Sequence, residues 1–292
     1  MNPSVPAGLE AMHPGMRLRQ AIAADETVPL IGVYDSFSAS IAGRHFQGIF
    51  VSGFSFAASH YGMPDIGFIT WTDMLAFVQR LRVVLPHHHI VVDIDDGYCD
   101  TEVACHVVRQ LARIGASAVV LEDQLRPRRC GHLDGKQIME LDAYLDKLNK
   151  VLDCRGDMLV VARTDATDDS EARRRAEAFA RAGADAILME AVKNLSMLTE
   201  VKQRVKRPLV FNQIAGGKSP PATLTELHAA GVSLVNYSTP CLFAAQAAID
   251  TAMQSLLAAD GRLPLDMPGQ VSVASCNQLL HQNLSGLQLR GS

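Results

Sequence analysis

Three stretches of the sequence share one pattern: IGASAVVLE (114–122), AGADAILME (182–190) and AGVSLVNYS (230–238). Each has a glycine where a helical pattern ends, then a short loop, then an apolar run with the length of a strand. The first two runs end in a carboxylate, Glu122 and Glu190. A repeated helix, loop and strand unit indicates an α/β protein with a parallel sheet.

Eight apolar or β-branched runs have the length expected of strands that are buried on both faces. They are PLIGVY (29–34), GIFVSG (48–53), HIVVDID (89–95), AVVLEDQ (118–124), MLVVART (158–164), AILMEA (186–191), LVFNQI (209–214) and LVNYST (234–239). Helical patterns lie between them, such as 100–115 and 169–183, and in the second an apolar stripe of Ala176, Phe179 and Ala180 lies beside Arg173, Arg174 and Arg175. Because the chain has no GxGxxG or Walker-type loop, we expect a closed (β/α)8 barrel and not an open doubly wound sheet.

The 292 residues suit a single barrel domain, 1–292. We expect a helix at about 15–25 to close the bottom of the barrel, and a tail outside the barrel at about 263–292, helical around 276–284. The net charge is −4, the six cysteines form no CxxC pair, and the apolar stretches look no longer than strands. We therefore expect a cytoplasmic protein without a disulfide framework, a nucleic-acid partner or a membrane span.

Polar residues stand where the predicted strands end, and active sites of barrel enzymes form at that edge. Four carboxylates so close together need a cation, and oxygen ligands favour Mg²⁺, or Mn²⁺. A single one of these residues would be explained as well by a capping group or an ion pair. The strand-end residues are Ser52, Gly53, Asp93, Asp95, Glu122, Arg163, Glu190 and Asn212.

Several motifs in this part of the chain resemble those of the isocitrate lyase and phosphoenolpyruvate mutase superfamily. They are SGF (52–54), GMPD (62–65), DIDDGY (93–98), RRCGH (128–132), ARTDA (162–166) and NxxxGGKSP (212–220), in the order of the family. The resemblance covers roughly residues 30–240. It implies a barrel whose C-terminal helix is swapped between subunits, in a homotetramer built as a dimer of dimers.

The resemblance also implies roles for individual residues. Asp93 is then the direct Mg²⁺ ligand, and Asp65, Asp95 and Glu122 hold water molecules bound to the metal. The small carboxylate substrate is bound by Ser52, whose hydroxyl acts together with the backbone N–H groups of Ser52-Gly53, and by the planar guanidinium of Arg163. The remaining substrate contacts are Tyr34, Phe54, Gly131, Glu190 and Asn212, and the catalytic residues are Glu122, Arg128, Cys130 and His132.

Cys130 lies in the polar stretch LRPRRCGHLDGK (125–136), beside three arginines and His132. Cationic neighbours lower the pKa of a thiol, so we expect a lowered pKa here, although a free surface cysteine is the alternative. By resemblance, Cys130 protonates the carbanion left when a C–C bond breaks, and His132 orients the substrate. Because the connection is long for a barrel, we expect residues 125–137 to be mobile without ligand and to close over the substrate.

Four positions depart from the family pattern. Arg128 stands where lyases usually have lysine, Phe54 where a small residue is usual, Cys99 in place of glycine, and Ala215 in place of an acid. These differences concern the substrate and not the fold. The run from His87 to His89 precedes strand three, and we expect it to be a solvated turn at the end of the barrel opposite the site.

The leading interpretation is a Mg²⁺-dependent lyase that cleaves a small 2-hydroxy di- or tricarboxylate into a 2-oxo acid (pyruvate or glyoxylate) and a second carboxylic acid. A phosphonomutase that forms a P–C bond is the second, because one mutase branch shares the RCGH loop. A hydrolase of an oxaloacetate-like acid is the third. A non-catalytic barrel that binds metabolites remains the alternative from another class.

Overall fold

The computed structural model describes residues 12–24, 27–98, 100–263 and 271–288. Eight parallel strands form a closed barrel in chain order, and the last strand pairs with the first. The strands are β1 (Val28–Val33), β2 (Gly48–Val51), β3 (His89–Asp93), β4 (Ala118–Glu122), β5 (Leu159–Thr164), β6 (Ala186–Met189), β7 (Leu209–Asn212) and β8 (Val232–Tyr237). The predicted (β/α)8 barrel is therefore confirmed.

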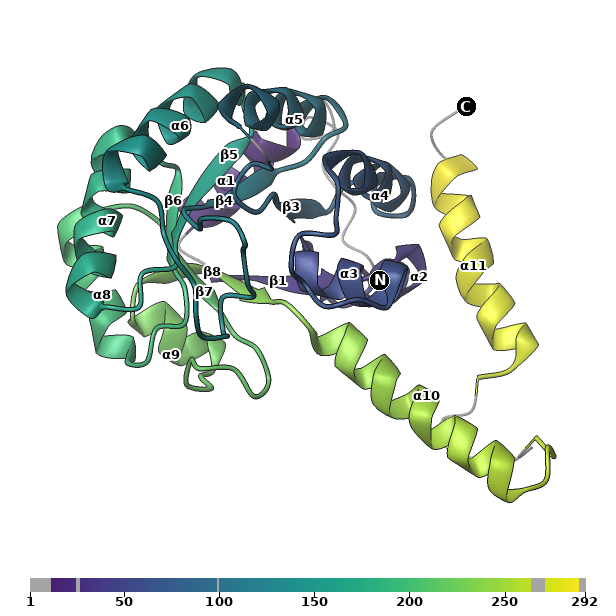
Figure 1. Ribbon diagram of the computed structural model, residues 1–292. Coiled ribbons are helices and arrows are strands. Elements are labelled where there is room, and N and C mark those ends of the chain that lie inside the picture. Colours follow the sequence, from purple (N-terminus) through teal and green to yellow (C-terminus); the bar gives the residue numbers. More distant parts are fainter. Residues whose placement is uncertain (1–11, 25–26, 99, 264–270, 289–292) are drawn as a thin grey trace. The chain divides into compact units, whose positions relative to one another are not determined.

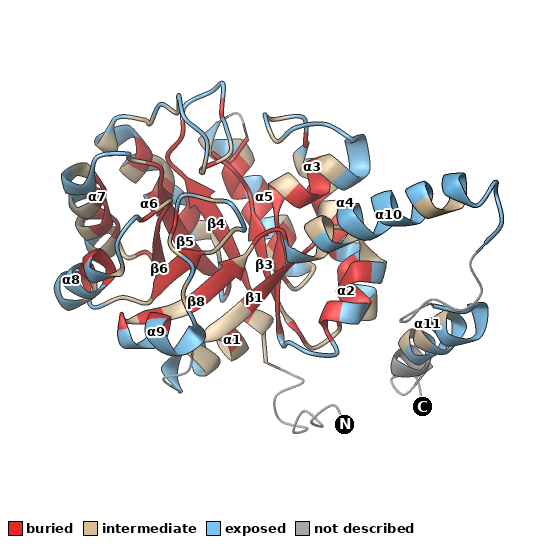
Figure 2. Ribbon diagram, turned by 90° about the horizontal axis from the view of Figure 1, so that it is seen from below, coloured by how far each residue is buried: buried red, intermediate tan, exposed pale blue. Residues whose placement is uncertain are grey.

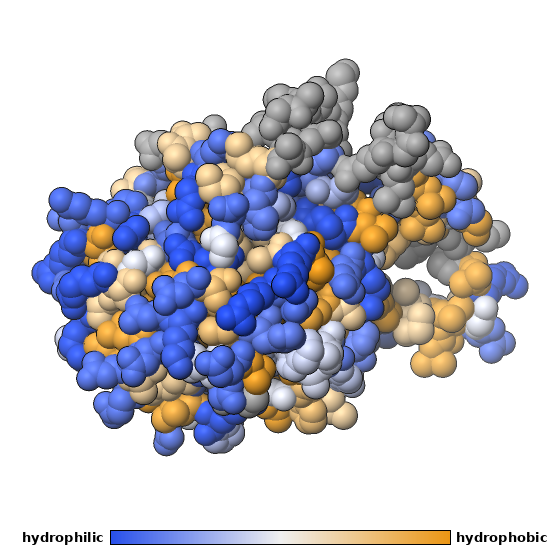
Figure 3. Space-filling view, turned by 90° about the horizontal axis from the view of Figure 1, so that it is seen from above, coloured by the Kyte–Doolittle hydropathy of each residue, from blue (hydrophilic) through white to orange (hydrophobic). Residues whose placement is uncertain are grey.

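Helices surround this barrel (Figure 1). They are α1 (Pro14–Ala23), α2 (Ser36–Ala42), α3 (Gly53–Tyr61), α4 (Trp71–Val84), α5 (Thr101–Arg113), α6 (Leu141–Cys154), α7 (Asp169–Ala182), α8 (Leu195–Val205) and α9 (Leu224–Ala229). Figure 2 shows that the strands and the inner faces of the helices are buried. The face drawn in Figure 3 is mainly hydrophilic, with smaller hydrophobic areas between, as expected of amphipathic outer helices.

The barrel interior is filled by inward-pointing aliphatic side chains from the strands, together with Phe50 from β2. Leu18 of α1 belongs to the same cluster and is fully buried. Helix α1 thus closes one end of the barrel with an apolar side chain. The opposite end, where the strands finish, is left to polar residues.

Seven of the eight predicted strands end one or two residues earlier than expected, and β5 alone ends where predicted. We extended strand three to Asp95 and strand six to Ala191, but β3 ends at Asp93 and β6 at Met189. Asp95 and Ala191 have φ values of 52° and 58°, which end the extended backbone. The chain therefore turns sharply just after the strand ends.

The expectation of a solvated turn at His87–His89 is wrong for His88. His88 is buried, and its Nε2 lies 2.8 Å from the carbonyl oxygen of Gly43. Burial, with Arg17 and Arg82 nearby, lowers the pKa of His89 to about 4. These histidines lie at the start of β3 and are packing residues.

Arg175 also differs from its expected place on the polar face of its helix. Its side chain is buried, and Nη1 lies 2.9 Å from Asp123 Oδ2. Nε donates to Glu171 and Nη2 to the carbonyl oxygen of Met139. Arg175 therefore ties α7 to the end of β4, and only Arg173 and Arg174 belong to the outer surface.

The described residues from Cys241 onward form a second compact unit. It contains most of α10 (Pro240–Ala258) and α11 (Val273–Gln288), and α11 covers the helix predicted at 276–284. Among the described helices, α10 alone is long and apolar enough to cross a membrane, by length and composition only. One such helix is weak support for a membrane span, but the expectation that apolar stretches are only strand-length is wrong here.

Candidate active site

Polar side chains gather where the strands end and enclose a cavity of about 20 Å³, which is room for about one water molecule. Ten of the residues predicted for the site line it, together with Ile214 and Ser238, which we had not singled out. The ten are Ser52, Phe54, Asp65, Asp93, Arg128, Cys130, Gly131, Arg163, Glu190 and Asn212. The structure thus brings most of the predicted site together in a closed form.

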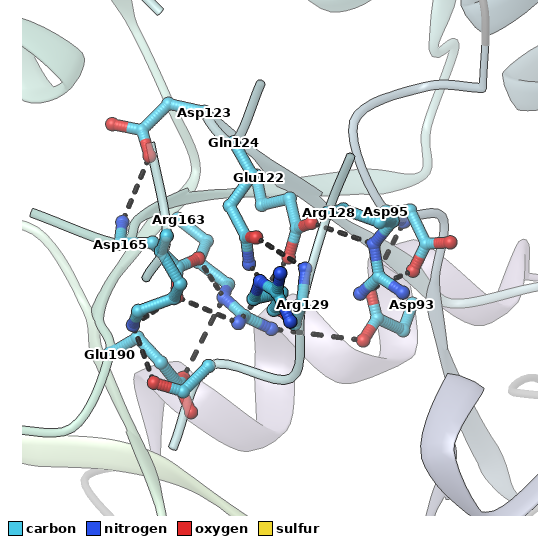
Figure 4. A network of polar contacts seen from close by, with 12 residues as sticks. Asp93, Asp95, Glu122, Asp123, Gln124, Arg128, Arg129, Arg163, Asp165 and Glu190 are labelled. Atoms are coloured by element: carbon cyan, nitrogen blue, oxygen red, sulfur yellow. Dashed lines mark hydrogen bonds and ion pairs between the residues drawn. The ribbon is translucent and has the colours of Figure 1, made fainter. Parts of the chain in front are cut away.

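Arg163, at the end of β5, lies at the centre of the polar network (Figure 4). Its Nε lies 2.8 Å from Asp165 Oδ2, and its Nη2 lies 3.3 Å from Glu122 Oε2. Burial alone would raise the pKa of Asp165, but Arg163 and Lys136 outweigh it and lower the pKa to about 2. Asp165 is therefore a permanent anion that holds Arg163 in place.

Arg128 binds three carboxylates at once. Its Nη1 lies 2.5 Å from Asp65 Oδ1, Nη2 lies 3.0 Å from Asp95 Oδ1, and Nε lies 3.0 Å from Glu122 Oε1. The side chain is 2% exposed. The three acids come from the loop before α4, the turn after β3 and the end of β4. Arg128 therefore connects three separate segments at the barrel mouth, the end of the barrel where the strands finish.

The site carries a surplus of negative charge. Six carboxylates (Asp65, Asp93, Asp95, Glu122, Asp165 and Glu190) face three cations (Arg128, Arg163 and Lys136) in this network. Burial, together with the neighbouring acids, raises the pKa of Asp93 and raises that of Asp95 to about 7. Burial also raises the pKa of Glu122 well above its usual value.

This chemistry fits a divalent cation. The donors near Asp93 are all oxygens and their charge is in excess. Glu122 Oε2 is buried with no hydrogen bond, and its ion-pair partner, Arg163 Nη2, lies 3.3 Å away. In the part of the chain that the structure describes, no three acidic, histidine or cysteine side chains already converge as a metal site. Arg128 lies among the same acids. The donor atoms are of the kind that binds a divalent cation, but in this arrangement they bind the guanidinium of Arg128.

A second chain of polar contacts crosses the mouth. Asn212, at the end of β7, donates to Glu190 Oε1 at 2.8 Å and accepts a hydrogen bond from Ser238. His132 Nε2 lies 2.9 Å from the same glutamate oxygen, while His132 Nδ1 accepts from the backbone N–H of Lys218. His132 therefore lies between Glu190 and the backbone of Lys218.

The loop that carries Cys130 is closed over the site. Arg126 donates two hydrogen bonds to Asp96, and Lys136 donates to Asp165 and to the carbonyl oxygen of Gly131. Gly131 itself passes so close to Arg163 that a Cβ would collide with Nη2, and it would lie 2.5 Å from Glu190 Cγ. Only glycine fits this approach. Mobility of residues 125–137 stays a prediction.

The expectation of a lowered pKa for Cys130 is wrong. Burial raises the pKa of the thiol, and the carboxylates of Asp65 and Glu190 act in the same direction. Arg163 lowers it, but does not outweigh these effects. Arg128 is paired with carboxylates, so the three arginines near Cys130 in the sequence do not together lower the pKa of its thiol. The thiol is kept protonated, which suits a proton donor.

The remaining predicted residues lie around this centre. Ser52 caps α3, and Gly53 begins that helix; a Cβ on Gly53 would lie 3.5 Å from Asp95 Oδ1 and 3.7 Å from Asp65 Oδ1. Tyr34 follows β1 and contacts Ser38 and Ser59 through its backbone, and it is outside the set of described residues that line the cavity. Ala215 is exposed, and Cys99 lies outside the described residues.

Three participants were missed from the sequence: Asp165, Lys136 and Ser238. Asp165 stands two residues after Arg163 in the motif ARTDA, from which we predicted only the arginine as a site residue. Ser238 follows β8, the one late strand end for which we named no site residue. The rule that strand ends carry the site would have found both, whereas the reach of Lys136 depends on how its loop folds.

Comparisons with known proteins agree with this geometry. The sequence profile of the phosphoenolpyruvate phosphomutase family matches residues 18–257. A 2-methylisocitrate lyase from Aeropyrum pernix is 34% identical over 84% of this chain and 80% of the relative. A 2,3-dimethylmalate lyase from Eubacterium barkeri is 28% identical over 82% and 84%. A chloroplastic carboxyvinyl-carboxyphosphonate phosphorylmutase from Arabidopsis thaliana is 32% identical over 82% and 74%.

Solved structures give the same relationship. A 2,3-dimethylmalate lyase of the PEP mutase/isocitrate lyase superfamily superposes with a TM-score of 0.88 at 28% identity, covering 96% of both chains. An oxaloacetate acetylhydrolase in complex with 3,3-difluorooxalacetate superposes with a TM-score of 0.87 at 26% identity, covering 96% of this chain and 98% of that one. The chain belongs to the phosphoenolpyruvate phosphomutase family, within the PEP mutase/isocitrate lyase superfamily.

Proposed function

We propose that the protein is a Mg²⁺-dependent carbon–carbon lyase. Its substrate is a small 2-hydroxy di- or tricarboxylate, and its products are a 2-oxo acid, pyruvate or glyoxylate, and a second carboxylic acid. The observation that carries this proposal is Cys130, a thiol kept protonated by burial on the wall of a closed, carboxylate-rich cavity. The names of the relatives, which include two lyases of hydroxy acids, support it.

The acids around Asp93 would hold the cation. We assign Asp93 as its direct ligand and Asp65, Asp95 and Glu122 as partners of its water molecules, because Mg²⁺ keeps several waters. When bound, the cation supplies a Lewis acid for the oxygens of the 2-oxo acid. Removing it with EDTA should abolish turnover.

The other side chains bind substrate and move protons. Arg163 and the N–H groups at the start of α3 bind the carboxylate of the 2-oxo acid half, since both present donors to an anion. Glu122, a buried carboxylate at the end of β4, takes the hydroxyl proton of the substrate. Cys130 then gives its proton to the carbon that leaves, and the closed loop excludes water from that carbanion.

Two other reactions have support from particular relatives. A phosphonomutase is favoured by the 32% identity to the carboxyvinyl-carboxyphosphonate enzyme. A hydrolase of an oxaloacetate-like acid is favoured by the superposition with the difluorooxalacetate complex. The phosphonomutase leaves no carbanion to protonate, so the role of Cys130 separates it from the lyase. The hydrolase also frees a carbanion, and is separated from the lyase by its substrate, an oxo acid that is cleaved with uptake of water.

We also propose that the enzyme is a homotetramer, a dimer of dimers in which α10 is exchanged between subunits. The apolar composition of α10, which has a mean hydropathy of 1.2 over its best window, supports burial against another protein surface. Size-exclusion chromatography with light scattering tests the assembly.

The activity is tested by a mass-spectrometric screen of hydroxy acids and one oxo acid with purified protein and Mg²⁺. The panel contains 2-methylisocitrate, 2,3-dimethylmalate and oxaloacetate, with and without EDTA. The lyase proposal expects one hydroxy acid to be cleaved into two acids only when metal is present. Cleavage that continues in EDTA with no metal by elemental analysis, or cleavage of oxaloacetate alone, would contradict it.

A further inference from the structure

Arg128 and a divalent cation would need the same partners. Each nitrogen of its guanidinium is paired with a carboxylate. Nη1 pairs with Asp65, Nη2 with Asp95 and Nε with Glu122. These are the acids that we assign to the water shell of the metal. A guanidinium is a weakly hydrated planar cation that suits several carboxylates at once, so it is an effective competitor for them.

The space in the site leads to the same result. The cavity beside Asp93 holds about one water molecule, and Arg128 forms part of its wall. Mg²⁺ binds six oxygens at about 2.0–2.1 Å and usually keeps several waters, which need far more room than this. In this arrangement the Arg128 guanidinium stands where the water shell of a cation beside Asp93 would reach the same three acids.

Arg128 is carried by a segment outside the barrel strands. It lies between β4 and α6, in a connection that is pinned to the mouth mainly through side chains, among them Arg126 on Asp96 and Lys136 on Asp165. The acids that Arg128 binds belong to the barrel end and to the loop before α4. Release of Arg128 would thus loosen the loop without disturbing the strands.

We propose that Arg128 is a tethered cation that occupies the carboxylate cluster in the ligand-free protein and competes there with the divalent metal. Metal binding and the closed position of residues 125–137 are then mutually exclusive until substrate is present. Arg128 acts as a positioning residue in this device: it holds the acids together and the loop closed, and it weakens metal binding. The inference rests on the metal of the proposed function but not on the reaction.

The test is a titration of substrate-free protein with Mn²⁺, followed by calorimetry or by the EPR signal of free Mn²⁺. Arg128→Gln removes the competing charge and should bind Mn²⁺ at least about tenfold more tightly than the unmodified protein. Arg128→Lys keeps one charge on a group that cannot bridge three acids, and should fall between the two. Arg129→Gln is the matched control, because Arg129 is the exposed neighbour on the same loop and should leave the affinity unchanged.

Hydrogen exchange of residues 125–137 gives a second readout. Mn²⁺ alone should speed exchange of this loop in the unmodified protein and in Arg129→Gln, but not in Arg128→Gln, whose loop is already released. Equal or weaker Mn²⁺ affinity in both Arg128 variants, or loss of Mn²⁺ binding in all proteins, would overturn the proposal. If Arg128→Gln does not fold, the Mn²⁺ affinity of Arg128→Lys, compared with that of the unmodified protein, decides the test. Tighter metal binding in a protein that cleaves no hydroxy acid would keep this inference and end the lyase proposal.

Discussion

Gly131 offers a test of loop closure that removes no reactive group. A Cβ at this position would collide with Arg163 Nη2 and lie 2.5 Å from Glu190 Cγ and 2.9 Å from Glu190 Oε1. Neither neighbour can retreat easily, because Arg163 is 5% exposed and held by Asp165, and Glu190 is held by Asn212. Gly131→Ala should therefore destabilise the closed loop and leave the barrel intact.

The size of the effect follows from the cost of overpacking. An extra methyl group in a tightly packed site costs about 1–3 kcal/mol. Here that cost falls on the closed state alone, so the ratio of closed to open loop should fall by a factor of about 5 to 150. The free energy of unfolding of the whole barrel should change much less, because the open loop relieves the collision.

Hydrogen exchange of residues 125–137 in the ligand-free protein measures this ratio. Protection in the loop should fall by the same factor of about 5 to 150 in Gly131→Ala, while protection in the barrel strands stays constant. Leu133→Ala is the control, since Leu133 lies on the same loop with a side chain that is 56% exposed. Unchanged protection in Gly131→Ala would refute the close approach of Gly131 to Arg163 and Glu190.

Three further predictions concern the metal, the fold and pH. Asp93→Ala should lose Mn²⁺ binding in calorimetry yet melt at the same or a higher temperature, because it removes a buried acid whose pKa is raised by burial and by Asp65; a lower melting temperature with metal binding retained would count against Asp93 as a ligand. Arg175→Met should lower the free energy of unfolding by about 3–5 kcal/mol in urea, because it leaves Asp123 buried without its arginine; a loss under 1 kcal/mol would mean that the pair is unimportant. His89 is kept neutral in the fold, its pKa lowered to about 4, so as pH falls below about 6.5 the unfolded chain takes up a proton that the folded chain does not. Between pH 7.5 and 5 the barrel should therefore lose about 2 kcal/mol more than His89→Gln loses, and parallel stability curves would show that His89 does not contribute.

Strand-end positions are the part of the site that the sequence predicts well. The alternation of apolar runs and helical patterns identifies each strand, and the side chains that follow the strands must meet at one end of a barrel. For this reason Asp93, Glu122, Arg163, Glu190 and Asn212 come together as expected, although they are far apart in the chain.

Contacts made by loops and long side chains are the part that the sequence does not predict. The arginines beside Cys130 suggest a lowered thiol pKa, but Arg128 turns to three carboxylates and burial raises the pKa instead. Arg175 looks like a surface residue among three arginines, yet it reaches Asp123 in the interior. In each case the outcome depends on a partner from a distant segment, which local pattern cannot identify.

The central claim, a lyase in which Cys130 protonates carbon, is tested most directly by cleavage in deuterated water. The unmodified protein should release the second acid with one deuterium on the carbon that was freed, because the thiol exchanges with solvent before it donates. Cys130→Ser should lose about 10²–10⁴-fold in turnover, since a hydroxyl is a much poorer acid. Cys154→Ser is the matched control, because Cys154 ends α6 at the opposite end of the barrel. A product without deuterium, or near-normal cleavage by Cys130→Ser, would contradict the account.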